Sequence, residues 1–362
     1  MCSKSMKPEI LFYKSDWPEA RERHEAFWRN EVLDRVCIAV YAPLKKKRPA
    51  LPPQEDWETY WMDPATWLRT AEHYFASTFF GGEALPQRMM MIPYAAHYGA
   101  KPVFVKDTIW CKPYLGDYWS LNDIHFDSEG LWWQSILHLL AEVCHASKER
   151  FLVSFPTFLD PIDTLGFGLR GPEGLCLDVL RRPQDVKQAI DYLTECWKKQ
   201  YIDCLSLISE VQDGTIDWLG VWSPKSNYVL SCDFSCMISP ALFNKLVKPI
   251  VEELSAWLNK PMYHLDGPGA VQHLDTLLSI SDLGGIQWVP GAGAAPPIEW
   301  MPLLKKIQSA GKRLHIEVDP SNVERAIKSL KPDGLFLSVP CSTEKEADKV
   351  LRVAEHYYRN HS

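Results

Sequence analysis

The second half of the chain repeats one pattern, in which a short apolar run stops at Gly, Pro or Asp and an amphipathic helical stretch follows it. This alternation is typical of βα units, whose strands lie parallel in one sheet with helices outside it. It predicts strands at residues 215–222, 261–265, 285–289, 314–318 and 334–339. A predicted helix follows each strand. The first begins at Ser239-Pro240, because Ser is a good N-cap and Pro a good first helical residue.

The first half of the chain is less regular. Buried strands are predicted at 36–41, 89–92 and 151–155, and helices at 18–30, 64–76, 131–150 and 184–210. Residues 1–35 are expected to form a helical extension, and residues 43–130, rich in Trp, Pro and Tyr, to form loops and insertions over the mouth of the fold. No tandem repeat or linker divides the chain. We therefore predict one TIM (β/α)8 barrel domain spanning residues 1–362.

Composition excludes several classes of protein. The net charge of −7 provides no basic surface for nucleic acid. No stretch approaches the roughly 18 apolar residues of a membrane helix, and the start of the chain lacks the apolar core of a signal peptide. The ten cysteines are scattered through a long chain instead of being concentrated in a short one, which favours reduced thiols and a cytoplasmic location.

Chemically active side chains gather at the predicted strand ends. In a parallel barrel these positions converge on one mouth, where barrel enzymes carry their active sites. The residues at these positions are Thr157, Asp160, Trp222, Asp233, His264, Asp266, Gln287, Glu317 and Cys341.

His264 and Asp266 form an H-x-D pair at the end of one predicted strand. Residues i and i+2 of a strand point to the same side, so both can face one atom. Together with Cys341, three strands further on, they would make a three-ligand site with one open position, which is the pattern of catalytic zinc. The alternative stays open, since H-x-D pairs are common and a Cys after a strand is usually a small buried hydrophobe.

Residues 231–269 have a distinctive order of features. An acidic residue follows a strand, a helix begins at MISP and contains a Pro, and the next strand ends in HLDG. This order resembles the uroporphyrinogen decarboxylase-like superfamily, which includes methyltransferases that work with corrinoid (cobalamin) proteins. The likeness extends to Cys341 and includes Leu33-Asp34-Arg35-Val36, similar to the family's entry to its first strand. The resemblance implies the same TIM barrel.

In the methyltransferase branch of that family the strand ends in H-x-C-G, and a second Cys follows the last strand. These three residues hold a zinc ion that activates a thiol. The matching positions here are His264, Asp266 and Cys341, so the resemblance implies zinc bound at those residues and a corrinoid-carrying partner protein. Asp replaces the family's first Cys, and a carboxylate is a harder donor than a thiolate. The decarboxylase branch fits less well, because its arginine-rich N-terminal motif is absent.

The remaining strand-end residues have proposed roles of their own. Asp233 is a candidate acid or base, and Glu317 a candidate catalytic group, a fourth metal ligand or half of a buried ion pair. Trp222, Trp288 and Gln287 are expected to contact substrate, the two indoles as flat walls. The leading interpretation is a zinc-dependent methyltransferase. A metal-independent decarboxylase or lyase using Asp233 and a non-catalytic small-molecule-binding barrel remain as alternatives.

Overall fold

A computed structural model describes residues 10–45 and 48–359. Parts of two predicted segments, residues 1–9 of the N-terminal extension and residues 46–47 of the insertion region, lie outside this description. The main sheet has seven strands in the order β2-β1-β13-β12-β11-β10-β9. All neighbours in it are parallel except β1 and β2. The seven are β1 (Cys37–Pro43), β2 (Thr78–Gly82), β9 (Asn227–Leu230), β10 (Lys260–Asp266), β11 (Gly285–Val289), β12 (Arg313–Glu317) and β13 (Leu335–Pro340).

Three two-stranded pairs complete the strands of the described residues. They are β3 (Met90–Met91) with β6 (Pro156–Thr157), β4 (Lys101–Phe104) with β5 (Ile109–Lys112), and β7 (Thr215–Ile216) with β8 (Trp222–Ser223).

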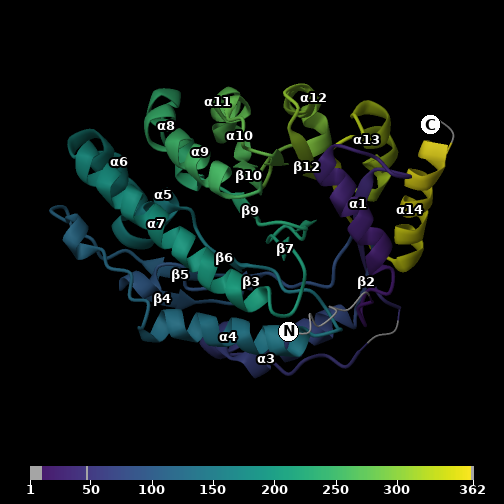
Figure 1. Cartoon of the computed structure of the whole chain (residues 1–362), viewed down its shortest axis with the longest axis horizontal. Helices are drawn as coiled ribbons and strands as arrows, with labels where there is room; N and C mark the ends of the chain where they lie inside the picture. Colours follow the sequence, from purple (N-terminus) through teal and green to yellow (C-terminus); the bar gives the residue numbers. More distant parts are fainter. Residues whose placement is uncertain (1–9, 46–47, 360–362) are drawn as a thin grey trace, which may run out of the picture.

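Helices surround the strands in Figure 1, and α11 to α14 follow one another along the outside of the sheet. The α-helices are α1 (Trp17–Arg29), α2 (Trp57–Met62), α3 (Pro64–Phe75), α4 (Leu131–Ser147), α5 (Pro161–Asp163), α6 (Pro172–Arg181), α7 (Pro183–Ile208), α8 (Pro240–Leu246), α9 (Lys248–Trp257), α10 (Gly267–Ala270), α11 (Leu274–Ser279), α12 (Met301–Ser309), α13 (Val323–Ser329) and α14 (Glu344–Arg359). Short helical turns are η1 (Ala96–Tyr98), η2 (Leu121–Asp123), η4 (Asp233–Met237), η5 (Val271–His273), η6 (Pro297–Trp300) and η7 (Pro320–Asn322), and η3 (Thr164–Arg170) is a π-helix.

The mixed α/β fold and the parallel sheet agree with the sequence, but the strand ladders of the described residues do not close a barrel. The gap lies on the side formed by the first half of the chain. There β6 begins at Pro156, which has no N–H to donate to a ladder. A single backbone bond, from Phe155 N–H to Ile216 O at 3.0 Å, links this side to β7. The apolar run 151–155 is buried as predicted, although it forms no regular strand.

The predicted strand 215–222 is continuous only over Thr215–Ile216, because the chain then reverses into the β7–β8 hairpin. Asp217 Oδ1 accepts the backbone N–H groups of Leu219 and Val221, each at 3.0 Å, which replaces strand pairing with a turn. Gly220 has φ of 82°, a left-handed conformation that Gly adopts without strain. As a result Trp222 lies on the returning strand of the hairpin and packs on Trp17 of α1, whereas Trp218 lies in the turn.

Helix α1 lies at the amino ends of the sheet strands. Lys260 and Arg313, the first residues of β10 and β12, both donate side-chain hydrogen bonds to the carbonyl of Trp28 in α1. Arg313 Nε also donates to Phe27 O at 3.1 Å. This helix therefore closes the amino end of the sheet, which leaves the carboxyl ends of the strands as the open side.

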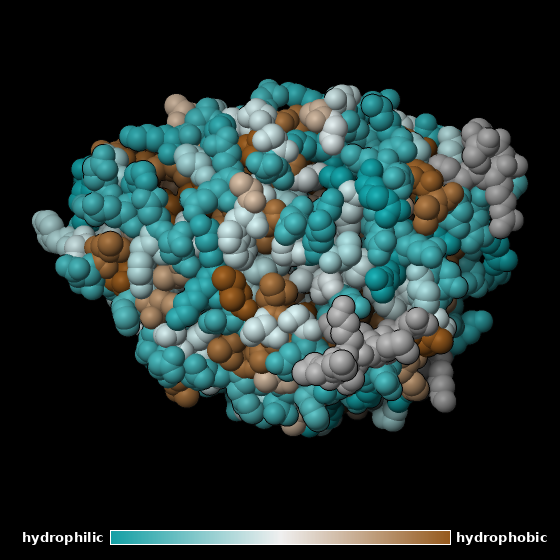
Figure 2. Space-filling view, in the orientation of Figure 1, coloured by the Kyte–Doolittle hydropathy of each residue, from teal (hydrophilic) through white to brown (hydrophobic). Residues whose placement is uncertain are grey.

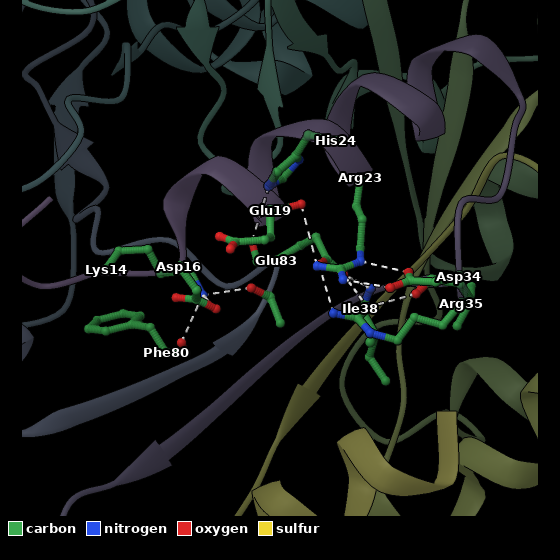
Figure 3. A network of polar contacts seen from close by, with 12 residues as sticks. Lys14, Asp16, Glu19, Arg23, His24, Asp34, Arg35, Ile38, Phe80 and Glu83 are labelled. Carbon is green, nitrogen blue, oxygen red and sulfur yellow. Dashed lines mark hydrogen bonds and ion pairs between the residues drawn. The ribbon is translucent and has the colours of Figure 1, made fainter. Parts of the chain in front are cut away.

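Buried charge ties this helix to the first strand (Figure 3). Glu83 is fully buried and accepts two hydrogen bonds from Arg35, at 2.5 and 2.9 Å, and one from Ile38 N–H at 2.7 Å. Arg23 of α1 pairs with Asp34 at 2.7 Å and reaches Glu83 at 3.5 Å. The Asp34-Arg35 pair thus fixes the entry to β1 against the helix that precedes it.

The insertion region is more regular than predicted. It contributes α2, α3, β2 and the β4–β5 hairpin, and Tyr114 N–H donates to Leu169 O of the π-helix η3 at 2.9 Å. The face in Figure 2 is mostly hydrophilic, with small scattered hydrophobic groups. None of the helices in the described ranges is long and apolar enough to cross a membrane. The cysteines within those ranges are all free thiols.

Candidate functional site

His264 lies near the carboxyl end of β10, and one hydrogen bond fixes its ring. Register pairs His264 with Gln287 on β11, and His264 Nδ1 lies 2.5 Å from Gln287 Oε1. Since an amide oxygen only accepts, Nδ1 carries the proton and donates. The Nε2 lone pair therefore stays available. Gln287 is buried and the His264 side chain is 16% exposed, so this contact is shielded from water.

Asp266 ends β10 on the same side as His264, as strand alternation predicts. Its Oδ2 is 3.9 Å from His264 Nε2, and its side chain is 46% exposed. The free nitrogen of the imidazole and a solvent-facing carboxylate oxygen thus face each other at the open end of the sheet. A proton or a cation between these two atoms would be bound by both.

A second group of carboxyls comes from the loops after β6 and β9. Asp163 is buried, and its two oxygens accept the backbone N–H groups of Asp233 at 2.7 Å and Phe234 at 3.0 Å. Asp160 Oδ2 accepts Ser231 N–H at 2.7 Å, while its Oδ1 is buried without a hydrogen-bond partner. These bonds position Asp233 by attaching its backbone to α5.

The carboxyls of this group hold their protons to higher pH than ordinary acids. Burial, with a contribution from Asp233, raises the pKa of Asp163 to about 7. Burial also raises the pKa of Asp233; His264 opposes that rise, and Asp266 adds to it. The pKa of Asp160 is raised well above its usual value, again first by burial. A carboxyl that is partly protonated near neutral pH can act as a general acid.

Trp218 supplies the aromatic wall of this site. Its ring meets the His264 ring edge to face, with centroids 5.1 Å apart. Its Nε1 donates to Val229 O of β9 at 3.2 Å, which fixes the indole over the strand next to β10. The Asp217 turn puts it there.

The third predicted metal ligand is not grouped with the other two. Cys341 directly follows β13, is 8% exposed, and donates its backbone N–H to Tyr41 O at 2.7 Å. Burial, followed by Glu346, raises the pKa of its thiol to about 11. Within residues 10–45 and 48–359, no set of three or more His, Cys, Asp or Glu side chains is arranged to hold a metal ion. Of the three predicted ligands, His264 and Asp266 face each other, with Nε2 and Oδ2 3.9 Å apart.

Glu317 ends β12 and is exposed. Partial burial and Asp319 raise the pKa of Glu317. Its neighbour His315 is buried on the same strand, with Nε2 2.8 Å from Ser338 Oγ. A catalytic or metal-binding role for Glu317 stays a prediction.

The two predicted tryptophan walls lie elsewhere. Trp222 is fully buried and packs edge to face on Trp17 with centroids 5.4 Å apart, because the hairpin returns it toward α1. Trp288 is also fully buried and packs against Trp300 of η6. It follows Gln287 in β11, so alternation directs it to the opposite face of the sheet. Both positions are corrected to packing positions away from His264.

Sequence reasoning missed Asp163 and did not assign Trp218 to the pocket. The segment Asp160-Pro-Ile-Asp163 carried a usable signal, because Pro begins a helix well and residues three apart on a helix share one side. For Trp218 the signal was the Asp-x-x-Gly sequence from Asp217 to Gly220, which is typical of a turn.

The fold has counterparts among solved structures. A methyltransferase from Methanosarcina mazei matches at TM-score 0.61 and 13% sequence identity, covering 94% of this chain and 99% of that one. A B12-independent methionine synthase from a Shewanella species matches at TM-score 0.39 and 8% identity, covering 62% of this chain and 67% of that one. No known protein family and no curated protein matches the sequence. At these identities the first likeness shows a shared fold.

Proposed function

We propose that this chain is a methyltransferase that moves a methyl group between a small methylated substrate or thiol and a corrinoid carried by a partner protein. The observation that carries the proposal is the His264–Gln287 hydrogen bond, which leaves Nε2 free beside Asp266 where the parallel strands end. The sequence resemblance and the fold shared with the M. mazei methyltransferase along nearly its whole length support it.

Zinc is proposed as the metal, held by His264 Nε2 and Asp266 Oδ2. Zinc binds His nitrogen and carboxylate oxygen at about 2.0–2.2 Å, so these two donor atoms, 3.9 Å apart, would have to approach to about 3.4 Å for tetrahedral coordination. A metal-binding His commonly donates its other N–H to an oxygen, as His264 does to Gln287. When bound, zinc would act as a Lewis acid on a thiol or a methyl-bearing heteroatom. Cys341 as a third ligand stays a prediction.

The chain's own residues would supply the proton and shield the reacting atoms from water. When a methylated substrate is the donor, the bond between its heteroatom and the methyl carbon breaks, and the reduced corrinoid of the partner would supply the electron pair of the new bond to that carbon. The heteroatom keeps its own electron pair and needs a proton, whereas a thiol that accepts the methyl group would lose one. Asp233 is the proposed donor, because burial raises the pKa of its carboxyl and Asp163 fixes its backbone. Trp218 excludes water on one side of His264.

A metal-independent lyase is the second candidate, favoured by the Asp163–Asp233 pair. NMR of ¹³C-labelled methyl ethers, methylated thiols and carboxylic acids separates the two, because it follows methyl transfer and CO2 release in one experiment. Methyl transfer that is lost in His264→Gln and kept in the surface variant His125→Gln supports the methyltransferase. CO2 release that is lost in Asp233→Asn and unaffected by Cys341→Ala supports the lyase. Tight binding without turnover would identify a binding protein.

Elemental analysis of protein purified without added metal tests the metal separately. We expect one zinc per chain, lost in His264→Gln. Correctly folded protein that contains no metal and keeps full activity with a chelator would overturn the zinc proposal. Zinc content in Cys341→Ala decides whether that thiol is a ligand.

A further inference from the structure

Polar side chains continue beyond His264 across three further strands. Register places Gln287 beside His264 and His315 beside Gln287. His315 Nε2 then lies 2.8 Å from Ser338 Oγ on β13. Neighbouring strands are about 4.8 Å apart, so side chains on one face at paired positions are adjacent. We call His264, Gln287, His315 and Ser338 the polar row.

One atom in the polar row has no partner. His315 is 3% exposed, and its Nδ1 is buried without a hydrogen-bond partner among the described residues. Buried polar atoms are nearly always paired, because an unmade hydrogen bond in the interior is unfavourable. The group beside His315 on β11 is the Gln287 amide, whose oxygen is already occupied by His264. Its NH2 group is the donor that His315 Nδ1 would accept from.

We propose that His315, held by Ser338, is a positioning residue that sets the orientation of the Gln287 amide and through it the tautomer of His264. The inference deepens the proposed function, since it concerns the imidazole on which that function rests.

Along the polar row, each donor faces an acceptor when all the hydrogen bonds are donated in one direction. Burial lowers the pKa of His315 to about 3, so its ring is neutral and has one donor and one acceptor. If Nε2–H donates to Ser338 Oγ, Nδ1 accepts and selects the NH2 end of the Gln287 amide. The amide oxygen then faces His264 and takes the proton on its Nδ1. Reversing His264, Gln287 or His315 alone would put two donors or two acceptors face to face, whereas the Ser338 hydroxyl can donate or accept.

The alternative direction has a chemical consequence. With the amide of Gln287 turned over, its NH2 group would face His264, which would have to carry its proton on Nε2. That nitrogen would then have no lone pair for a cation or for a substrate proton, although Asp266 would still be nearby. The polar row thus decides whether His264 can act as a ligand or as a base.

The test reads the tautomer directly by ¹⁵N NMR of histidine-labelled protein, with the His264 signals assigned by their loss in His264→Gln. Wild-type protein should show His264 protonated on Nδ1. If His315 Nδ1 accepts one hydrogen bond from the Gln287 amide, His315→Phe should lower the ratio of this tautomer to the Nε2–H form roughly five- to tenfold. Ser338→Ala should shift it in the same direction. His97→Phe, which also removes a buried imidazole but lies outside the polar row, should leave it unchanged.

Unchanged His264 signals in both His315→Phe and Ser338→Ala would overturn the proposal, and Ser338→Ala gives the answer if His315→Phe does not fold. Gln287→Glu should keep the Nδ1–H tautomer, because a carboxylate is an acceptor, whereas Gln287→Leu should lose it. The measurement needs no substrate. Failure to detect methyl transfer would therefore count against the proposed function and leave this inference standing.

Discussion

His97 is a buried histidine with no hydrogen bond from its ring, and replacing it should stabilise the protein. Its side chain is 2% exposed and packs among Tyr98, Phe126 and Trp133, with ring centroids 4.6, 5.4 and 5.2 Å away. Both ring nitrogens are buried without a partner. Phenylalanine keeps an aromatic ring in this environment and removes both polar atoms. His97→Phe is therefore the perturbation.

The size of the effect depends on pH. An unsatisfied buried polar group destabilises by about 1–3 kcal/mol, so we expect His97→Phe to be more stable at pH 7 by an amount in that range. Burial lowers the pKa of His97 from 6.5 to about 3. The unfolded chain therefore binds a proton that the folded one refuses, and stability is lost as pH falls from about 6.5 toward 3. At pH 5 this loss is about 2 kcal/mol for one group, and the variant should not show it.

Urea unfolding at pH 7 and pH 5 measures both quantities. The difference in unfolding free energy between His97→Phe and wild type should increase by about 2 kcal/mol on going to pH 5, with the urea slope unchanged. His24 and His315 are buried with lowered pKa values as well, so both proteins keep part of the acid sensitivity. Exposed His125 provides the control, because His125→Gln should change little at either pH. A destabilised variant, or a difference that stays constant with pH, would refute the reasoning.

Three further predictions test other parts of the structure. Arg35→Leu should destabilise by about 3–5 kcal/mol in urea unfolding, because it leaves Glu83 buried without its partner, and the double variant with Glu83→Leu should recover most of that loss. The pKa of Asp163 is raised from 3.8 to about 7 in the folded state, so stability is lost as pH rises through that interval, and Asp163→Asn should flatten this part of the stability profile. Trp218→Leu should raise KM about two- to tenfold, because Trp218 contacts the His264 ring. Trp222→Phe should lower the melting temperature and leave KM unchanged, because Trp222 packs on Trp17. The opposite pattern would show that Trp222, and not Trp218, contacts the substrate.

The second half of the fold was predictable because each local signal there agreed with its packing. The bounds of the predicted strand 285–289 match those of β11 to the residue. Ser239 caps helix α8 by accepting Leu242 N–H, as expected. His264, Asp266 and Gln287 gather because parallel strands in register bring neighbouring ends together.

The errors arose where a local turn or a strand face decided the outcome. An apolar run at 215–222 hid the turn made by Asp217, so Trp222 was assigned to the wrong end. Trp288 was assigned to the mouth because it lies near a strand end. That assignment overlooked that consecutive strand residues, here Gln287 and Trp288, point to opposite faces of the sheet. Neither spacing nor residue type reveals that Asp163 reaches the backbone of Asp233, since that contact joins loops 70 residues apart.

Formation of methylcobalamin from cob(I)alamin and methylated donors tests the central claim most directly, because free corrinoid can stand in for the carried one and its spectrum reports the methyl transfer itself. We predict that the wild-type protein catalyses this transfer. The rate should fall at least tenfold in Gln287→Leu, which disturbs the support of His264, and further in His264→Gln. Full activity in His264→Gln, or no methyl transfer by well-folded wild-type protein with ethers, thioethers and methylated amines, would contradict the account.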